Sequence, residues 1–331
     1  MNIAIVGCTG MVGRKFIEVV QERNLHADEF YLYASAKSAG TKIKVFDKEY
    51  TVIELTKENV VDKKIDIALF SAGGAVSRDF APVFASTGAI VVDNSSQWRM
   101  DKDVPLVVPE VNENDVLENK GIIANPNCST IQAMLVLKPL DDAFGIKRVV
   151  YSTYQACSGA GVKGYNDLKN GIEGKDPEKF PVRIFSNCIP HIDVFTESGY
   201  TKEEEKMINE TRKILHRPDM KITATTVRVP VFNSHSESIN IEFNKPSTPE
   251  AVREILRSAR NVVVIDDAAN ALYPTVVDAD GKDEVFVGRI RKDFSVESGV
   301  NLWCVADNIR KGAATNAVQI AQSLIKLGLV K

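Results

Sequence analysis

The first stretch of the chain constrains the fold more than any other. An apolar run over residues 2–6 predicts a buried strand, and apolar residues at helical spacing over 12–21 predict a helix directly after it. Gly7, Gly10 and Gly13 follow at intervals of three positions, from the end of the strand into the start of the helix. A strand that turns at once into a helix is the opening of a β-α-β unit, so this stretch favours a parallel sheet.

The alternation of strands and helices continues to about residue 125. Further strands are predicted over 30–34, 65–70, 90–93 and 122–125, and helices over 77–86 and 113–118. This pattern indicates an α/β fold with a Rossmann-like, doubly wound parallel sheet covered by helices on both faces.

The pattern changes after residue 126. A helix is predicted over 129–137, ending before Pro139, followed by long β-rich runs over 146–155, 221–231 and 236–243. The alternation over 238–243 is typical of a sheet with one solvated face. Shorter elements are a charged helix over 203–215, expected on the surface, a helix over 249–259 and a strand over 262–265. We therefore expect a second α+β domain with a largely antiparallel sheet.

Length and composition limit the remaining possibilities. A chain of 331 residues is too long for one ordinary core, which favours two domains. A net charge of -3 with interleaved signs argues against nucleic acid as a partner. The apolar runs are too short to cross a membrane, and the start does not resemble a signal peptide, so we expect a cytoplasmic protein. The five cysteines are widely spaced without a CxxC pair, which predicts neither a metal site nor a disulfide framework.

The glycine turn predicts a dinucleotide site. Glycines let the backbone approach a pyrophosphate, and the helix that follows presents free N–H groups and a favourable dipole. The alternative is an ordinary glycine-rich turn without a ligand. The residues on which this prediction rests are Gly7, Gly10 and Gly13.

The end of the second predicted strand favours NADP over NAD. An NAD site usually places an acidic residue there, to bind the ribose 2′-hydroxyl. This chain has Ser35, Lys37 and Ser38 instead, which supply two hydroxyl donors and a positive charge for a 2′-phosphate. A solvated loop with an incidental lysine is the alternative.

Cys128 is the candidate nucleophile. It lies between the predicted strand end and the predicted helix start, where the helix dipole favours a thiolate and backbone N–H groups can stabilise an oxyanion. Asn127 adds a possible donor. A thiolate beside a nicotinamide suggests a thioester-forming aldehyde oxidoreductase, whereas most cysteines at helix starts are structural.

Such a reaction calls for a proton-transfer group and an anion-binding group. His235 and Arg228 lie close together in sequence, at a predicted strand and its exit turn. Imidazole suits proton transfer near neutral pH, and a guanidinium fork suits a carboxylate. From spacing alone, a turn histidine and a surface salt bridge are equally open readings.

Five stretches together resemble the bacterial aspartate-semialdehyde dehydrogenase family. They occur in the family's order over nearly the whole chain and comprise residues 7–13, 125–130, 153–161, 228–235 and 307–314. The resemblance implies residues 1–126 plus 309–331 as an NADP-binding Rossmann domain, completed by a last helix over about 313–327, and 127–308 as a catalytic and dimerisation domain. It also implies a homodimer or dimer of dimers.

The activity implied by the resemblance is reduction of L-4-aspartyl phosphate by NADPH to L-aspartate 4-semialdehyde and phosphate. This step feeds lysine, threonine, methionine and isoleucine synthesis. A related reductase acting on N-acetyl-glutamyl phosphate, a catalytically silent relative and a thiol redox sensor are the alternatives. The presence of Cys128, Gln155, Arg228 and His235 together argues against the silent relative and the sensor.

The resemblance also implies individual roles. Cys128 forms the acyl-enzyme, His235 is the acid/base, Gln155 orients the substrate and Arg228 holds its carboxylate. Arg99 and Lys206 bind the phosphate, and Asn127 and Glu203 are further substrate contacts. The implied NADP contacts are Ser35 to Ser38 and, in addition, Thr9, Met11, Val12, Ser158, Gly159 and Asn308. The family's resemblance implies no metal.

Overall fold

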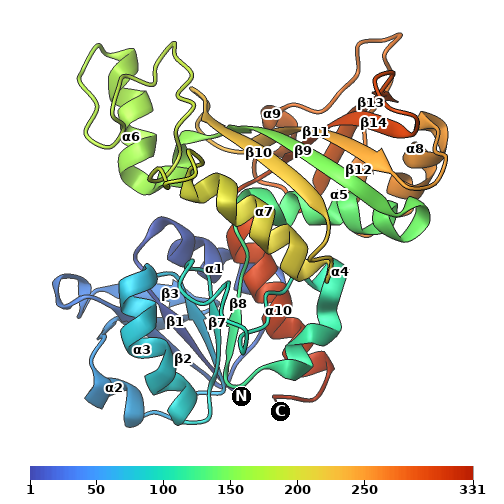
Figure 1. The fold of residues 1–331 in the computed structure, drawn as a ribbon. Coiled ribbons are helices and arrows are strands. Elements are labelled where there is room, and N and C mark those ends of the chain that lie inside the picture. Colours follow the sequence, from blue (N-terminus) through green and yellow to red (C-terminus); the bar gives the residue numbers. More distant parts are fainter. Residues whose placement is uncertain (331) are drawn as a thin grey trace. The chain divides into compact units, whose positions relative to one another are not determined.

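The structure is a computed structural model, and it describes residues 1–330. The chain forms two compact units, residues 1–127 with 313–331 and residues 128–312 (Figure 1). The predicted domain limits, 126 and 309, lie close to these boundaries. Each unit is described separately below.

The first unit contains a six-stranded parallel sheet. Its strand order is β5-β2-β1-β6-β7-β8, and every neighbouring pair is parallel. The strands are β1 (Asn2–Val6), β2 (Glu29–Ala34), β5 (Ile53–Glu54), β6 (Ile67–Phe70), β7 (Ile90–Asp93) and β8 (Ile122–Ala124). The order reverses between β1 and β6, so the crevice beyond the carboxyl end of β1 is where such sheets bind ligands. A hairpin of β3 (Lys42–Val45) and β4 (Lys48–Thr51) forms a separate small sheet.

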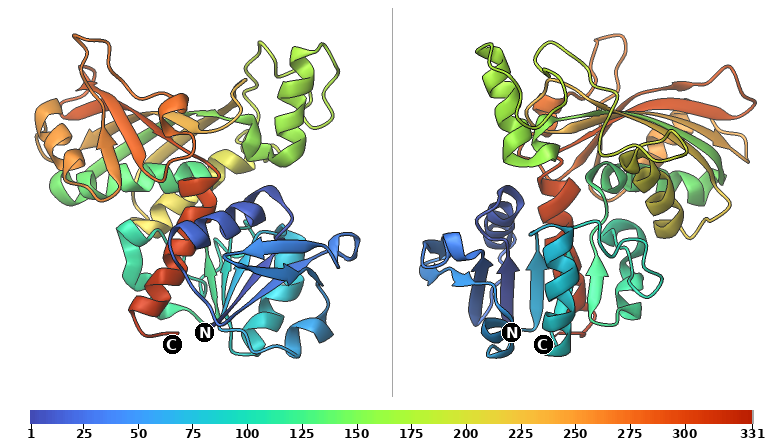
Figure 2. Two further views of the ribbon diagram at one scale, coloured as in Figure 1. Left: turned by 180° about the vertical axis from the view of Figure 1, so that it is seen from behind. Right: turned by 60° about the vertical axis from the view of Figure 1, so that its left-hand side comes forward.

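Helices cover both faces of this sheet (Figure 2). One face carries α1 (Met11–Glu22) and α10 (Thr315–Lys326), which pack against each other, and the other carries α2 (Lys57–Val61) and α3 (Gly74–Ser86). The shorter helices are η1 (Ala36–Ser38), α4 (Pro109–Asn112) and η2 (Glu113–Glu118). The predicted doubly wound α/β class is confirmed.

The C-terminal helix belongs to the core of the first unit. Ala317, Ile320 and Leu324 of α10 share one hydrophobic cluster with Ile3 of β1 and Phe16 of α1. The buried Asn316 side chain donates to the Val107 carbonyl at 2.9 Å and to Asn125 Oδ1 at 2.7 Å. The last helix therefore packs back on the first unit, as expected.

The second unit is built on a mixed sheet. Its strand order is β10-β9-β11-β14-β13-β12, in which the two outer pairings are parallel and the three central ones antiparallel. The strands are β9 (Ile146–Gln155), β10 (Lys221–Arg228), β11 (His235–Phe243), β12 (Val262–Val264), β13 (Val285–Lys292) and β14 (Gly299–Ala306). The predicted second domain with a largely antiparallel sheet is confirmed.

One face of this sheet is covered by α5 (Cys128–Phe144) and α7 (Lys202–Ile214) (Figure 1). Along β11 the residues that point to this face are buried and apolar in its second half, namely Ile239, Ile241 and Phe243. The other elements of the unit are η3 (Cys157–Ala160), α6 (Gly161–Ile172), α8 (Pro249–Arg257), α9 (Val276–Ala279) and a short π-helix, η4 (Arg310–Ala314).

Two predicted helices differ from the structure. The helix expected to end before Pro139 continues to Phe144, because Leu137 and Leu140 on either side are fully buried and this packing outweighs the proline's lost hydrogen bond. The charged helix expected on the surface is instead half-buried, and Met207 and Ile214 are among its buried residues. Its many charged residues suggested exposure, but several of its acidic side chains form hydrogen bonds within the unit. The run predicted as a strand over 221–231 ends at Arg228.

Between residues 1 and 330, the structure contains no helix with the length and apolar character needed to span a bilayer.

The contacts of Asn316 generate a stability prediction. Asn316→Leu should lower the free energy of unfolding by about 2–4 kcal/mol, because two buried acceptors lose their donor. Urea unfolding followed by tryptophan fluorescence and circular dichroism measures this. Lys326→Ala on the same helix is the control, since it removes only an exposed ion pair with Glu113 and should change stability by less than ~1 kcal/mol. Equal unfolding midpoints for the two variants would contradict the assignment.

Candidate active site

Cys128 is the first residue of α5 and is partly exposed. At this position the positive end of the helix dipole favours the thiolate over the thiol. Gly312 lies directly against it, since a Cβ placed at residue 312 would come within 2.9 Å of Cys128 Cβ. The backbone opposite the cysteine therefore tolerates only glycine without displacing the nucleophile.

Gln155, Arg228 and His235 form a row across three neighbouring strands. Gln155 and Arg228 are register partners at the ends of β9 and β10, and His235 begins β11 beside them. All three side chains are buried. A glycine makes room for the row, because a Cβ on Gly159 would lie 2.9 Å from Arg228 Nη1 and 3.1 Å from His235 Nε2.

The hydrogen bonds of His235 define its tautomer. The Ala156 backbone N–H donates to His235 Nδ1 at 3.0 Å, so the neutral ring carries its proton on Nε2. Among the described residues this Nε2 has no hydrogen-bond partner. Burial, together with the positive charge of Arg228, lowers the pKa of His235 to about 3. At neutral pH the ring is therefore uncharged and can donate a hydrogen bond from Nε2.

Arg228 is a buried cation. Its Nη1 donates to the Ala156 carbonyl at 2.5 Å, whereas Nε has no hydrogen-bond partner within the described part of the chain. Burial lowers the pKa of Arg228, and the charges of Glu203 and Cys128 raise it. Since a guanidinium does not lose its proton in proteins, the group keeps its charge and attracts an anion.

A chain of polar contacts continues from this row. Thr153 Oγ1 donates to Gln155 Oε1 at 3.0 Å, and Gln155 Nε2 donates to Glu203 Oε1 at 3.1 Å. Lys206 Nζ lies 3.2 Å from the other oxygen of Glu203 and 2.7 Å from Asp193. The structure thus brings Glu203 and Lys206 together with Gln155.

The remaining predicted residues of the second unit support the turn before His235. The buried Asn308 accepts from the Ser234 N–H at 2.9 Å and donates to Ser158 Oγ at 3.1 Å. Ser234 has a φ of +68°, in the left-handed region that is unfavourable for serine, so this hydrogen bond stabilises an otherwise strained turn. Ser158 and Asn308 therefore lie at the edge of the row formed by Gln155, Arg228 and His235.

In the first unit, the glycine turn packs tightly against neighbouring backbone. Gly7 has a φ of +81°, and a Cβ there would lie 2.3 Å from the Ser71 carbonyl oxygen. A Cβ on Gly13 would lie 2.0 Å from the Gly7 oxygen. Gly10 caps α1 without a side-chain hydrogen bond, which leaves N–H groups of the first turn to bind an anion. Thr9, Met11 and Val12 are partly exposed beside it.

The other predicted residues of the first unit lie at the carboxyl edge of its sheet. Ser35 and Lys37 are exposed and follow β2. Arg99 is buried and donates to the carbonyls of Asn94 at 3.0 Å and Asn125 at 2.9 Å, which follow β7 and β8. The partly buried Ser38 ends η1, and the buried Asn127 precedes Cys128 in the chain. No group of three or more potential metal-ligating side chains is found among residues 1–330.

Comparison with known proteins identifies the family. Residues 2–119 match the family model described as the semialdehyde dehydrogenase NAD binding domain, and residues 137–311 match the semialdehyde dehydrogenase dimerisation domain. The aspartate-semialdehyde dehydrogenase of Aquifex aeolicus is 59% identical over 99% of both chains, and that of Bacillus subtilis is 48% identical over 100% of this chain and 99% of its own. The chain belongs to the aspartate-semialdehyde dehydrogenase family.

Solved structures agree with this assignment. Aspartate semialdehyde dehydrogenase II from Vibrio cholerae has a TM-score of 0.92 at 46% identity, covering 98% of each chain. The same protein solved in complex with ASA gives a TM-score of 0.93. The predicted resemblance is therefore confirmed, and the first unit of this aspartate-semialdehyde dehydrogenase relative contains a nicotinamide-nucleotide-binding domain.

Sequence reasoning missed three groups at the site. The backbone N–H and carbonyl of Ala156 bind His235 and Arg228, but a main-chain contact cannot be recognised from the residue type. Asp193, which pairs with Lys206, lies in an irregular segment without periodicity. Glu237 had a detectable signal, because it lies two residues after His235 on the same face of β11.

The depressed pKa of His235 predicts acid sensitivity. As the pH falls, the unfolded chain takes up a proton on this histidine near pH 6.5, whereas the folded protein does so only near pH 3. Folding stability therefore decreases through this window, by about 2 kcal/mol between pH 7 and 5. His235→Asn should lose about 2 kcal/mol less than the parent over the same range. Urea unfolding at both pH values measures the difference, and identical losses would refute it.

Proposed function

We propose that this aspartate-semialdehyde dehydrogenase family member catalyses the NADP-dependent reductive dephosphorylation of L-4-aspartyl phosphate through a thioester on Cys128. The product is L-aspartate 4-semialdehyde, a precursor of lysine, threonine, methionine and isoleucine. The observation that carries the proposal is a cysteine at a helix N-terminus in the same unit as a buried, partly unpartnered Arg228 and a neutral His235.

The substrate's charges match the cations of the site. Arg228 pairs with the α-carboxylate of the substrate, using the guanidinium edge that includes Nε. Lys206 and Arg99 supply positive charge for the phosphate. Gln155, whose amide is oriented by Thr153 and Glu203, is the substrate-orienting group. Glu203 and Asn127 complete the proposed substrate contacts.

The tautomer of His235 determines which proton transfer this residue can perform. The Cys128 thiolate attacks the acyl carbon, the C–S bond forms, and the C–O bond to phosphate breaks. His235 donates from Nε2 to the carbonyl oxygen as negative charge develops there. After reduction, breaking the C–S bond releases the aldehyde and restores the thiolate. Because the cysteine begins and ends as thiolate, the neutral donor form of His235 is sufficient in this direction.

The residues of the first unit fit a dinucleotide. A Cβ at Gly7 or Gly13 would clash with neighbouring backbone, so these glycines allow the tight turn that presents the start of α1, whose N–H groups can bind a pyrophosphate. Ser35, Lys37 and Ser38 bind the 2′-phosphate, and Ser158, Gly159 and Asn308 are proposed as contacts from the second unit. When bound, NADPH supplies the hydride that reduces the thioester. An NADP complex of the Candida albicans aspartate semialdehyde dehydrogenase, at 27% identity, is in line with this choice.

A spectrophotometric assay tests the proposal. With aspartate semialdehyde, phosphate and NADP, the protein should form NADPH, and Cys128→Ala should abolish turnover while NADP still binds in a fluorescence titration. Cys188→Ala, at an exposed cysteine, is the matched control and should keep full activity. Turnover by the Cys128 variant would refute the thioester, and equal efficiency with NAD would refute the cofactor preference.

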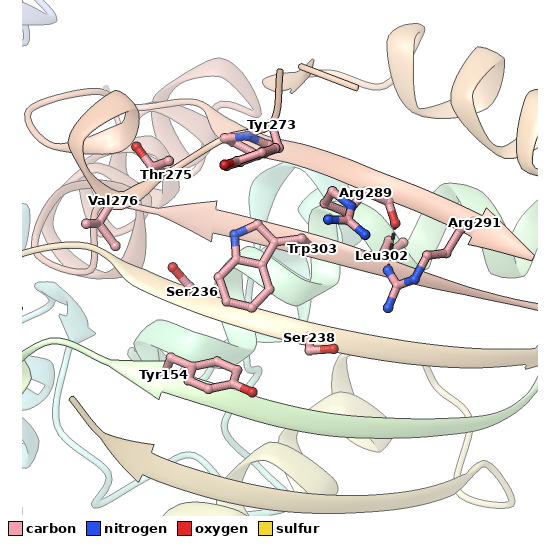
Figure 3. A pocket seen from close by; sticks show the side chains of 11 residues that line it. Tyr154, Ser236, Ser238, Tyr273, Thr275, Val276, Arg289, Arg291, Leu302 and Trp303 are labelled. Atoms are coloured by element: carbon pink, nitrogen blue, oxygen red, sulfur yellow. Dashed lines mark hydrogen bonds between the residues drawn. The ribbon is translucent and has the colours of Figure 1, made fainter. Parts of the chain in front are cut away.

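We also propose that the chain forms a homodimer through the open face of the second unit's sheet. On the side away from α5, Tyr154, Ser236 and Ser238 lie beside Trp303 (Figure 3). The Tyr154 and Trp303 rings are 5.3 Å apart, and Tyr154 is 38% exposed. Aromatic side chains and arginines on a sheet face favour burial against a second copy, and residues 137–311 match a dimerisation domain.

Trp303→Glu tests this surface. A charge on the proposed contact should convert the dimer to a monomer of 36.4 kDa in size-exclusion chromatography with light scattering. Phe294→Glu is the control, because Phe294 is 89% exposed at the β13–β14 turn, outside the aromatic patch. A dimer that survives the Trp303 substitution would place the interface elsewhere.

A further inference from the structure

A long irregular segment of the second unit connects α6 to α7 (Figure 1). It covers residues 173–201, all of which the structure describes, and its only strand-like pairings are isolated bridges. Loops longer than about 15 residues without secondary structure of their own are uncommon in compact domains, and ordered ones usually have a function. This segment contacts two of the residues that the proposed function uses.

The segment meets Arg228 in two places. Ile189 and Arg228 exchange both of their backbone hydrogen bonds, at 2.9 and 2.8 Å. In addition, Arg228 Cζ lies over the Phe180 ring, 5.8 Å from its centroid. Further along the segment, Asp193 pairs with Lys206 at 2.7 Å. Both the backbone and the charged group of Arg228 are therefore held by residues of this segment.

Phe180 covers a cation whose hydrogen bonds are incomplete. Arg228 Nη1 donates to the Ala156 carbonyl, whereas Nε has no partner within the described part of the chain. An aromatic ring attracts a guanidinium that lies over its face, while the hydrogen bonds of the guanidinium lie in its own plane. The ring therefore restricts the tilt of that plane and leaves the edge with Nε available to an anion.

One buried acid fixes the backbone that carries this ring. Asp167 of α6 is 3% exposed. Its Oδ1 accepts from the Glu178 N–H, and its Oδ2 accepts from the N–H groups of Lys179 and Phe180, each at 2.8 Å. Hydrogen bonds to a carboxylate are roughly twice as strong as those between neutral groups. Three of them to successive residues hold the chain up to the Phe180 N–H.

Packing limits the remaining freedom of the ring. A Cβ placed at Gly164 of α6 would lie 3.1 Å from Phe180 Cζ, so the helix approaches the ring closely only because residue 164 is glycine. On its other contacts the ring packs against a buried cluster of Cys157, Leu168, Ile184 and Ile189. Since Leu168 directly follows Asp167, the same turn of α6 fixes the backbone of Phe180 and packs against its side chain.

We propose that Asp167 is a positioning residue, which holds Phe180 over the Arg228 guanidinium and so fixes the plane in which Arg228 binds the carboxylate of the amino-acid substrate. This inference rests on the proposed function, because it takes Arg228 as the carboxylate-binding group. It assigns to Asp167 neither a proton transfer nor a contact with the substrate. The effect is confined to the amino-acid substrate, since phosphate and NADP are assigned to other residues.

Phe180→Leu tests the ring. Leucine keeps an apolar side chain but offers no aromatic face to the guanidinium, so the KM for aspartate semialdehyde should rise about three- to thirtyfold while kcat stays within about twofold. The KM values for phosphate and NADP should not change, a split that a general loss of structure does not produce. Phe185→Leu is the matched control, because Phe185 lies in the same segment, is 38% exposed and should leave all three KM values unchanged.

Asp167→Asn tests the acid. Asparagine has the same shape but loses the charge and one acceptor oxygen, so the KM for aspartate semialdehyde should rise as in Phe180→Leu. Hydrogen–deuterium exchange of peptides that cover 178–180, measured without substrate, should be on the order of tenfold faster. Asp167→Glu, which keeps the charge but displaces it by one methylene, should give the same results, and it replaces the asparagine variant if that protein does not fold.

A second substrate-free measurement separates this proposal from the proposed function. Modification of Arg228 by phenylglyoxal, followed by mass spectrometry, should be faster in Phe180→Leu and Asp167→Asn than in Phe185→Leu. A parent protein without turnover of aspartate semialdehyde would refute the proposed function, whereas the exchange and modification rates still test the contacts. The proposal is overturned if Phe180→Leu matches Phe185→Leu in modification rate or in KM, or if Asp167→Asn leaves exchange at 178–180 unchanged.

Discussion

The backbone of Ala156 provides the contacts on which the row of Gln155, Arg228 and His235 depends. Its N–H donates to His235 Nδ1 and its carbonyl accepts from Arg228 Nη1, so two successive peptide groups joined at one Cα set the positions of both side chains. The same contact decides the chemistry, because an imidazole that accepts at Nδ1 is left to donate at Nε2. Since Ala156 directly follows Gln155 at the end of β9, the strand register places all three side chains together.

In the second unit, some buried charged side chains lie beside an opposite charge and others do not. Glu203 and Asp193 face Lys206, whereas Arg228 has no carboxylate within hydrogen-bonding distance among the described contacts and retains an unpartnered Nε. Burial, together with this buried cation, lowers the pKa of His235, and the cation favours an anionic ligand. The arrangement therefore favours negative charge at the cysteine and substrate positions.

Much of this could be predicted from the sequence where a periodic pattern carries the information. The alternation along 238–243 identified the solvated and buried faces of β11, and extending it by two steps places both Glu237 and His235 inward. The doubly wound sheet followed from the glycine turn and the strand spacing. Features without a periodic pattern were predicted less well. The helix α5 continues past Pro139, α7 is half-buried, and the strands β13 and β14 were not predicted. Long-range packing rather than local propensity determines these features.

Glycines at the site show why its shape was harder to predict than its chemistry. The Gly7 turn is recognisable from its spacing, since a ligand-binding turn and a helix follow each other in the chain. Gly159 and Gly312 are needed for another reason, because Arg228, His235 and Cys128 occupy the space that a side chain would fill. Those neighbours come from distant positions in the sequence. A reactive residue can therefore be recognised by its type, but the space that lets it react is defined only when the strands and helices have packed.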